Sequence, residues 1–493
     1  MPDNPLAPDW LHAPDDGNAF VPEVWPTGIR RTDDGVAVIG GVRVDDLVAD
    51  YATPLYVLDE RVVRELAERV RLAFTDAFER VDTTAEVYYA GKAFLSTEVA
   101  RWVTEAGLRI DVASGGELAV ALAAGVDAGR LGLHGNNKSR AEIDRAIEVG
   151  VGTIVIDSEQ EIARVAQAAS AHGRVQRVRL RVRTGVHAHT HEFLATAHED
   201  QKFGVALDDA ERLVALIRSH DGLEFVGLHC HIGSQIFGAD GFAESAARLV
   251  AVHARLLAGG PVPELNLGGG FGIAYTSADE PDRIEDLAQR VAQVLAAECE
   301  RANIPLPVVA FEPGRYIVGP AGVTLYTVGT TKPVNLDADG TPAQRLYVSV
   351  DGGMSDNARP ALYGADYSAR IVSRTSPAEP VLVRVAGKHC ESGDIVVNDE
   401  YLPADVAEGD VLAVAATGAY CWSLSSNYNY LPRPAVVAVS DGASRMIVRG
   451  ETVDDLLVRD LGARHAETAP AVERRHEDAP GPLARADRQE GAK

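Results

Sequence analysis

Eight short β-type segments alternate with stretches of helical periodicity between about residue 60 and residue 315. The helical stretches SRAEIDRAIEVG and SEQEIARVAQAAS begin with Ser and carry an acidic residue in the first turn, as helix N-termini prefer. This alternation predicts a (β/α)8 barrel, whereas an open doubly wound sheet usually has fewer strands and an early GxGxxG turn. The predicted strands are AEVYYA (85–90), LRIDVA (108–113), RLGLHG (130–135), TIVIDS (153–158), RVRLRVR (177–183), EFVGLHCHI (224–232), ELNLGG (264–269) and PVVAFEP (307–313).

A second region, from about residue 320 to residue 460, loses the helical periodicity. Short β-type runs separated by Gly, Asp and Pro predict an all-β domain, a barrel or a sandwich. VAVIGGVRV (36–44) is typical of short strands around a Gly-Gly turn. The predicted domains are residues 1–58 contributing strands to the β domain, 59–315 the barrel, 316–462 the β domain, and 463–493 a disordered, charged tail without aromatic residues.

Charge and cysteine content limit the possible partners and the compartment. The chain has 47 basic and 72 acidic residues, and 47 − 72 = −25, which argues against a nucleic-acid or anionic-membrane partner. The four cysteines show no CxxC spacing, so neither a disulfide framework nor a zinc site is expected. The N-terminus lacks a signal-peptide pattern, and no window approaches ~20 uninterrupted apolar residues. We expect a cytoplasmic protein.

Polar side chains gather where the predicted strands end, which is where a barrel places its active site. A buried strand end gains nothing from an unpaired charge, so a ring of such residues indicates chemistry. The residues concerned are Lys92, Asp111, Ser114, His134, Asn136, Arg183, His229, His231, Ser234, Gly268–Gly270, Glu312 and Arg315.

The glycines Gly268, Gly269 and Gly270 would let backbone N–H groups approach a phosphate closely. Gly314 and Arg315 follow the next strand, and barrels often bind phosphate with the loops after strands seven and eight. Lys92, after the first strand, would point into the mouth, where desolvation favours Schiff-base chemistry. Phosphate and a reactive lysine together indicate pyridoxal phosphate.

Other polar groups have roles that fit this cofactor. Glu312 would face the pyridine nitrogen and favour its protonated form. His229 and His231 share a strand face, but no third ligand is evident, so stacking of an imidazole on the cofactor ring is preferred to a metal site. The run from His187 to His191, with His189 between, also resembles a metal site; no metal is predicted there either.

Three clusters in the β region carry further polar residues. MSDNARPALY supplies Arg359 and Tyr363, KHCESGD supplies Cys390 and Glu391, and TGAYCWSLSSNYN supplies Tyr420. Loops of this composition are expected at a functional site rather than in a core.

The motifs YYAGKA, DVASGGEL, HGNNKS, HCHIGSQ, LNLGGGFG, EPGRYIVGPAG, DGGMSDNARPALYGA, CESGD and GAYCWSLSSNYNYLPRP resemble those of diaminopimelate decarboxylases, from about residue 85 to residue 434. That family belongs to the alanine-racemase-like enzymes dependent on pyridoxal phosphate. The resemblance implies decarboxylation of meso-2,6-diaminopimelate to L-lysine by a homodimer with shared active sites.

The resemblance also implies roles for individual residues. Lys92, Cys390 and His231 would be catalytic, with Lys92 holding the cofactor, His231 stacked on its ring and Cys390 donating a proton from the partner subunit. The cofactor would further contact Asp111, Ser234, Gly268, Gly269, Gly270, Glu312, Gly314, Arg315 and Tyr420. The substrate would contact Arg315, Arg359, Tyr363, Glu391 and Tyr420.

Alternatives within the same fold stay open at this point. The distal end of diaminopimelate carries a carboxylate, which suits arginine, and an ammonium, which suits an acid; a diamine-forming decarboxylase needs mainly acids there. An ornithine, arginine or carboxynorspermidine decarboxylase, or an amino-acid racemase, is the first alternative. A non-catalytic pyridoxal-binding relative is the second, and it should lack Lys92, Glu312 or Cys390. The strand end RVRTGVHAHTHE departs from the family's Arg-x-Asn-Pro turn, so the contacts of Arg183 are not predicted.

Overall fold

The computed structural model describes residues 4–186 and 201–463. The chain divides into two units, residues 1–450 and residues 451–493. The His187, His189 and His191 run and the predicted tail beyond residue 463 lie outside the described residues.

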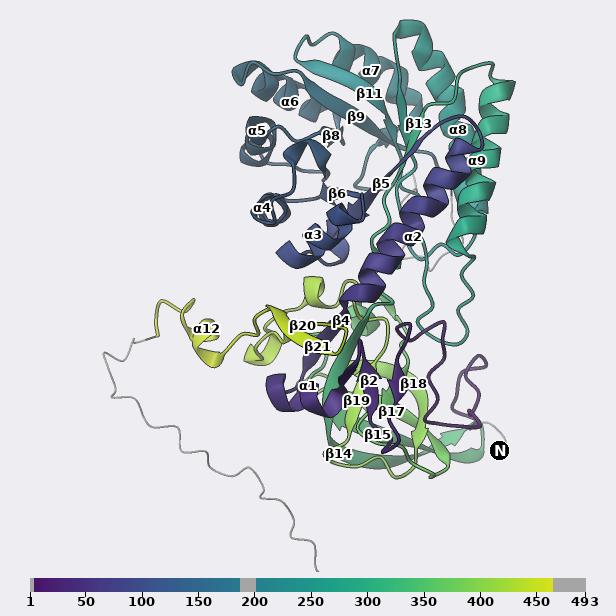
Figure 1. The fold of residues 1–493 in the computed structure, drawn as a ribbon, viewed down its shortest axis with the longest axis vertical. Helices are drawn as coiled ribbons and strands as arrows, with labels where there is room; N and C mark the ends of the chain where they lie inside the picture. Colours follow the sequence, from purple (N-terminus) through teal and green to yellow (C-terminus); the bar gives the residue numbers. More distant parts are fainter. Residues whose placement is uncertain (1–3, 187–200, 464–493) are drawn as a thin grey trace, which may run out of the picture. The chain divides into compact units, whose positions relative to one another are not determined.

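The eight predicted barrel strands form one closed parallel sheet (Figure 1). Strand β9 pairs with β11 on one side and with β8 on the other, which closes the ring and confirms the predicted (β/α)8 barrel. A two-residue strand, β10 (Val205–Ala206), lies beside β9. The barrel strands are β5 (Ala85–Ala90), β6 (Arg109–Val112), β7 (Leu131–Leu133), β8 (Thr153–Ile156), β9 (Gln176–Arg183), β11 (Leu223–His229), β12 (Glu264–Asn266) and β13 (Val308–Phe311).

Helices surround this sheet. Ser139 and Glu142 form a capping box at the start of α5, and Gly150 ends that helix at a φ of 83°. Ser158 occupies the N-cap position of α6, but its side chain makes no capping hydrogen bond. No helix within the described ranges is long and apolar enough to cross a membrane. The helices are α2 (Glu60–Glu79), α3 (Thr97–Glu105), α4 (Gly115–Ala123), α5 (Arg140–Val149), α6 (Glu159–Ala171), α7 (Ala210–Arg218), α8 (Asp240–Leu256), α9 (Ile284–Arg301) and the four-residue α10 (Arg315–Val318).

A buried ion pair crosses the interior of the barrel. Arg179 on β9 donates to Glu264 on β12 at 2.8 Å and to the Tyr88 hydroxyl on β5 at 3.1 Å. Strands β9 and β5 are not neighbours in the sheet, so these contacts span the barrel. The interior below the strand ends is therefore filled by side chains and is not a channel.

The β domain contains a second sheet, of nine strands. Strand β4, far away in the sequence, pairs antiparallel with β14 and parallel with β20 and so lies inside this sheet. The β-type runs in the sequence of this region are VTLYTVG, RLYVSVDGG, VLVRVAG, DVLAVAATG, AVVAVSDG and RMIVRG, and strands β16 and β18 lie outside them. The sheet comprises β4 (Leu55–Asp59), β14 (Gly322–Ala338), β15 (Thr341–Val350), β16 (Ala369–Ile371), β17 (Pro380–Ala386), β18 (Ile395–Pro403), β19 (Val411–Val414), β20 (Ala435–Ser440) and β21 (Ala443–Val448), with helix α11 (Arg359–Tyr363) between β15 and β16.

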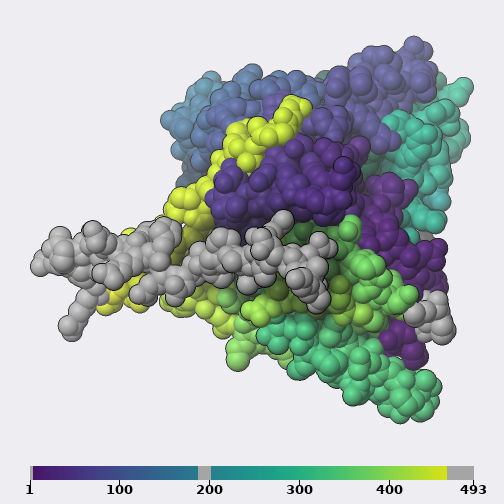
Figure 2. All heavy atoms as spheres, turned by 60° about the horizontal axis from the view of Figure 1, so that its bottom comes forward, coloured from purple at the N-terminus to yellow at the C-terminus, as the bar shows by residue number. Residues whose placement is uncertain are grey.

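The N-terminal strands divide between two sheets. β1 (Arg30–Arg31), β2 (Ala37–Ile39) and β3 (Val42–Arg43) form a three-stranded sheet of their own, and helix α1 (Val44–Tyr51) follows it. Within residues 36–58, only β4 therefore pairs in the larger sheet. In Figure 2 the purple N-terminal region lies between the blue barrel surface and the green β domain.

The second unit has one described helix, α12 (Val453–Leu457), which begins with a capping box of Thr452 and Asp455.

Candidate active site at the barrel mouth

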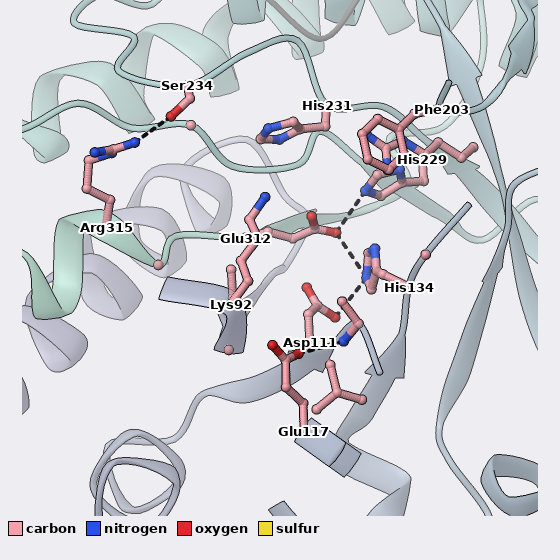
Figure 3. Close-up of a pocket in the computed structure, with 18 of the residues that line it drawn as sticks. Lys92, Asp111, Glu117, His134, Phe203, His229, His231, Ser234, Glu312 and Arg315 are labelled. Atoms are coloured by element: carbon pink, nitrogen blue, oxygen red, sulfur yellow. Dashed lines mark hydrogen bonds and ion pairs between the residues drawn. The ribbon is translucent and has the colours of Figure 1, made fainter. Parts of the chain in front are cut away.

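A cavity opens where the barrel strands end (Figure 3). Its empty volume is about 930 Å³, open mouth included, which lies within the range of small-molecule sites. Nine residues given a cofactor or substrate role from the sequence line it: Lys92, Asp111, His231, Ser234, Gly270, Glu312, Gly314, Arg315 and Tyr420. His134 and His229, singled out at their strand ends, line it as well.

The remaining predicted site residues do not line this cavity. Gly268 and Gly269 serve backbone packing, since a Cβ on Gly269 would lie 2.0 Å from the carbonyl oxygen of Glu312. The others belong to the β domain: Arg359, Tyr363, Cys390 and Glu391.

Lys92 lies in a short 3-10 turn, Gly91–Ala93, directly after β5. Gly91 allows this turn to pack closely, because a Cβ there would lie 2.9 Å from the carbonyl oxygen of Asp111. The lysine side chain is exposed to the cavity and extends toward His231 and Glu312 in Figure 3.

One end of the cavity presents a cation and small polar groups. Arg315 donates to the Ser234 hydroxyl at 2.7 Å and also to the Tyr275 hydroxyl. Gly270 adopts a φ of 108°, and a Cβ there would lie 2.2 Å from the carbonyl oxygen of Gly233, so only glycine lets the backbone pass this closely. Arginine, hydroxyl and close backbone form a site suited to a phosphate.

The other end contains a network of acids and imidazoles. Oε1 of Glu312 accepts from Asn266 at 2.8 Å and lies 3.0 Å from Nε2 of His229 and 3.6 Å from Nε2 of His134. His134 also lies 3.0 Å from Asp111. These side chains come from five different strands or strand ends, so barrel closure brings them together.

Burial and neighbouring charges set the protonation of this network. Burial raises the pKa of Glu312, but His229 and His134 outweigh burial and hold it well below its usual range. Burial lowers the pKa of His229 to about 4, against the attraction of Glu312. For His134, burial opposes protonation, yet the charges of Asp111 and Glu312 raise its pKa overall. An ionised Glu312 therefore lies beside His229, which is neutral at pH 7, and beside His134, whose pKa is raised.

Asp111 differs from Glu312. Burial raises its pKa to about 6, and Glu312 adds to the increase while His134 opposes it. Both Asp111 oxygens, and both ring nitrogens of His229, are buried without an aligned hydrogen bond. The base of the cavity thus contains polar groups whose hydrogen-bonding capacity is unmet.

The same residues have the spacing of a metal site. His134, His229 and Glu312 each offer a ligand atom, all within 4.8 Å of one another.

Several lining residues were not predicted. Arg181, rather than Arg183, reaches the cavity, and its guanidinium lies 4.3 Å from the ring centroid of Phe203. Arg183 instead donates to the carbonyl of Gly204 at 2.7 Å, so it supports the segment that carries Phe203. Alternation along β9 could have indicated Arg181, which shares a strand face with Arg183. Glu117 and Phe271 also line the cavity.

Tyr420 joins the β domain to the lysine turn. Its backbone N–H donates to the carbonyl of Ala93 at 2.8 Å, one residue after Lys92, and its φ is 65°. The guanidinium of Arg315 lies 4.7 Å from its ring centroid. A left-handed conformation is costly for a tyrosine, which fits a position constrained by a site.

The Cys390 loop does not line this cavity. Cys390 is exposed, and its N–H donates to the Asn429 side chain at 3.1 Å. Its neighbour His389 is buried against Asp394, 3.0 Å away. Glu391 accepts from the Tyr428 hydroxyl at 3.4 Å. The loop is thus held in a defined shape on the surface.

Comparison with known proteins identifies the class. Residues 64–319 match the family described as pyridoxal-dependent decarboxylase, pyridoxal binding domain. The diaminopimelate decarboxylase of Mycobacterium tuberculosis is 50% identical over 446 residues, 89% of this chain and 98% of that one. The enzyme of Bacillus subtilis is 43% identical over 436 residues, 88% and 97% respectively.

Solved structures of decarboxylases also match this chain. Diaminopimelate decarboxylase from M. jannaschii in complex with L-lysine matches with a TM-score of 0.81 and 30% identity, covering 89% of this chain and 99% of that one. A lysine/ornithine decarboxylase from Vibrio vulnificus matches with a TM-score of 0.66 at 21% identity, covering 80% and 97%, and so shares the fold.

The fold and the site define a decarboxylase that depends on pyridoxal phosphate. Within that class, the chain belongs to the family of diaminopimelate decarboxylases.

The cavity fits pyridoxal phosphate. The Arg315 end suits the phosphate, the Glu312 end offers an ionised acceptor for a protonated ring nitrogen, and Lys92 lies between them. A ring nitrogen would also occupy the polar base where hydrogen bonds are unmet.

The neutral state of His229 predicts a pH dependence of stability. Its pKa of about 4 lies below the ordinary 6.5, so protons favour the unfolded chain and stability falls as pH falls through 6.5 toward 4. Between pH 7 and pH 5.5, the apoprotein should lose about 1 kcal/mol more unfolding free energy than a His229→Gln variant. Urea denaturation at each pH measures this difference.

A matched control lies outside the cavity. Burial also lowers the pKa of His253, in α8, to about 4, so His253→Gln should flatten the profile similarly. Equal pH profiles for wild type and His229→Gln would contradict a neutral, buried His229.

Proposed function

We propose that this protein decarboxylates meso-2,6-diaminopimelate to L-lysine and CO2 with pyridoxal phosphate, and so acts as a carboxy-lyase in the last step of lysine biosynthesis. The family membership supports the reaction, and the cavity contains a lysine, an anion site and an ionised carboxylate in the required relation.

One observation on buried charge carries the proposal for the substrate. Among the described residues six arginines are buried, and four of them pair with an acid: Arg179 with Glu264, Arg181 with Asp157, Arg345 with Asp399 and Arg370 with Glu400. Arg315 and Arg359 have no carboxylate partner within the described chain. A buried cation without a counterion is costly, so these two arginines are suited to anions of a ligand. A phosphate and a distal substrate carboxylate supply two such anions.

We assign residue roles on this basis. When bound, pyridoxal phosphate supplies the electron sink that makes loss of CO2 feasible. Lys92 holds the cofactor through its Nζ, and Glu312 keeps a proton on the ring nitrogen. His231, neutral because burial first and then Lys92 and Arg181 keep its pKa well below its usual range, covers the ring without adding charge.

The phosphate and substrate contacts follow the same logic. Arg315, Ser234 and Gly270 bind the phosphate, with Gly268, Gly269 and Gly314 shaping the loops around it and Asp111 at the base of the cavity. Arg359 and Tyr363 bind the distal carboxylate, Glu391 binds the distal ammonium, and Tyr420 covers both ligands.

The proton balance needs one donor. One C–C bond breaks, CO2 leaves, and one C–H bond forms at the same carbon, with no net oxidation. The Sγ–H of Cys390 supplies that proton. Because Cys390 and Glu391 are exposed and do not line the cavity of their own chain, they serve the cavity of a partner subunit in a homodimer.

The surface around this loop supports an interface. Large apolar side chains of the β domain are exposed, with Leu362 57%, Tyr428 41% and Tyr430 67% exposed, and the Tyr428 ring stacks on His389 of this loop. Exposed apolar side chains of this size are typical of contact surfaces. We also propose a cytoplasmic location, since all four cysteines are free, as in a reducing compartment.

The alternative decarboxylases are less well supported. The lysine/ornithine decarboxylase shares the fold at 21% identity, whereas diaminopimelate decarboxylases share 40–50%. Lys92, Glu312 and Cys390 are all present, which disfavours a non-catalytic relative.

Replacing Lys92 tests the cofactor assignment. Lys92→Ala should abolish turnover and the visible absorbance of lysine-bound pyridoxal phosphate, because no other amine of the described chain lines the cavity. Activity assays and absorbance spectra at saturating cofactor measure both. Near-normal turnover in this variant would overturn the assignment.

Mixing two inactive variants tests the shared site. Lys92→Ala and Cys390→Ala should each be inactive, but subunit exchange should restore about a quarter of the wild-type activity, since half of randomly assorted dimers gain one intact site of two. The assay follows CO2 release after mild dissociation and reassociation. If mixing restores nothing while mixed dimers are demonstrated by tags, Cys390 does not act across subunits.

A further inference from the structure

The two buried arginines without acidic partners are both in contact with tyrosine rings. The guanidinium carbon of Arg359 lies 4.6 Å from the ring centroid of Tyr275 and 5.5 Å from that of Tyr367. Arg315 lies 5.6 Å from the Tyr275 centroid and donates to its hydroxyl. Tyr275, itself 5% exposed, therefore contacts both cations at once.

The rings of Tyr275 and Tyr367 also pack against each other. They meet edge to face, with centroids 5.1 Å apart and planes at 78°. Arg359 donates to the Tyr367 hydroxyl at 2.5 Å. Burial raises the pKa of Tyr367 well above its usual range, and Arg359 offsets this only in part, so the phenol stays neutral.

A neutral aromatic partner has a different effect from a carboxylate. An acid would cancel the charge of a buried arginine, as it does for the other four. A tyrosine ring stabilises the cation through its quadrupole and accepts a hydrogen bond, yet leaves the positive charge for another anion. Tyr275 stands where the structure would otherwise need an acid.

We infer that Tyr275 is a positioning residue that couples the phosphate-binding Arg315 to the substrate-binding Arg359, and that Tyr275 and Tyr367 keep both cations free for ligand anions. The inference rests on the proposed function for the identity of those anions. It explains why Arg359, which does not line the cavity, is nevertheless linked to it: the path runs through one phenol ring.

Two substitutions separate the hydroxyl from the ring. Tyr275→Phe removes the acceptor for Arg315 and keeps the ring, so the Kd of pyridoxal phosphate should rise roughly twofold to tenfold, with KM for diaminopimelate within about twofold. Tyr275→Leu removes both, so KM should also rise, roughly threefold to thirtyfold, while kcat at saturating cofactor changes less. Cofactor titration of the apoprotein and steady-state kinetics measure these values.

A matched control comes from the β domain. The ring centroid of Tyr347 lies 5.9 Å from Nζ of Lys332 and 6.0 Å from the guanidinium carbon of Arg384, and this tyrosine does not line the cavity. Tyr347→Leu should therefore leave the cofactor Kd and the KM for diaminopimelate unchanged. A purely structural role for Tyr275 would lower thermal stability and the active fraction but leave KM unchanged. Kd and KM within twofold of wild type in a folded Tyr275→Leu variant would overturn the inference.

Further readouts keep the test decisive. If Tyr275→Leu does not fold, Tyr367→Phe removes the acceptor for Arg359, together with the contact of that hydroxyl to Sγ of Cys421 at 3.7 Å, and keeps the ring, so KM should rise roughly twofold to tenfold with an unchanged cofactor Kd. An unchanged KM in that variant would overturn the Arg359 half of the inference. If the wild type does not decarboxylate diaminopimelate, the proposed function fails instead, and the cofactor Kd of Tyr275→Phe still tests the Arg315 half.

Discussion

Closure of the parallel barrel is the constraint on which the site depends. Pairing of β8 with β9 brings the ends of eight strands into one ring, although the residues concerned span more than two hundred positions of sequence. Lys92 follows the first strand and Glu312 the last, and these two strands are neighbours in the closed sheet. An open sheet would not place His134 and His229 on the same carboxylate. The β domain adds to this ring through Tyr420, whose backbone binds the lysine turn.

The distribution of buried charge distinguishes structure from chemistry. Arg179 with Glu264 fills the barrel interior as a closed pair, and such pairs satisfy their own charges. At the mouth the arrangement is different, because Glu312 lies between two imidazoles whose pKa values shift in opposite directions, and Arg315 and Arg359 have aromatic partners. Charges left without a matching acid or base are concentrated around one cavity, and the chemistry of a charged cofactor and a zwitterionic substrate explains this concentration.

Part of the fold and part of the site could be predicted from the sequence. The strand positions followed from alternation, and Lys92, Glu312 and Arg315 were identified because each follows a strand in a motif. Some strands are shorter than predicted. In β12 only Glu264–Asn266 is extended, and the glycines from Gly268 onward lie in the loop after it. Arg181, Phe203 and Glu117 were missed because their approach to the cavity depends on strand facing and on a loop path. Tyr275 was missed because its contacts join residues 40 and 84 positions away, a distance that no local pattern reveals.

The most direct test measures CO2 release from a panel of amino acids with and without added pyridoxal phosphate. The panel contains meso-diaminopimelate, L-ornithine, L-arginine and carboxynorspermidine, and product analysis identifies L-lysine. The account predicts cofactor-dependent release from diaminopimelate, with one lysine formed for each CO2, and little from the others. Comparable release from ornithine or arginine, or none from diaminopimelate at saturating cofactor, would contradict it.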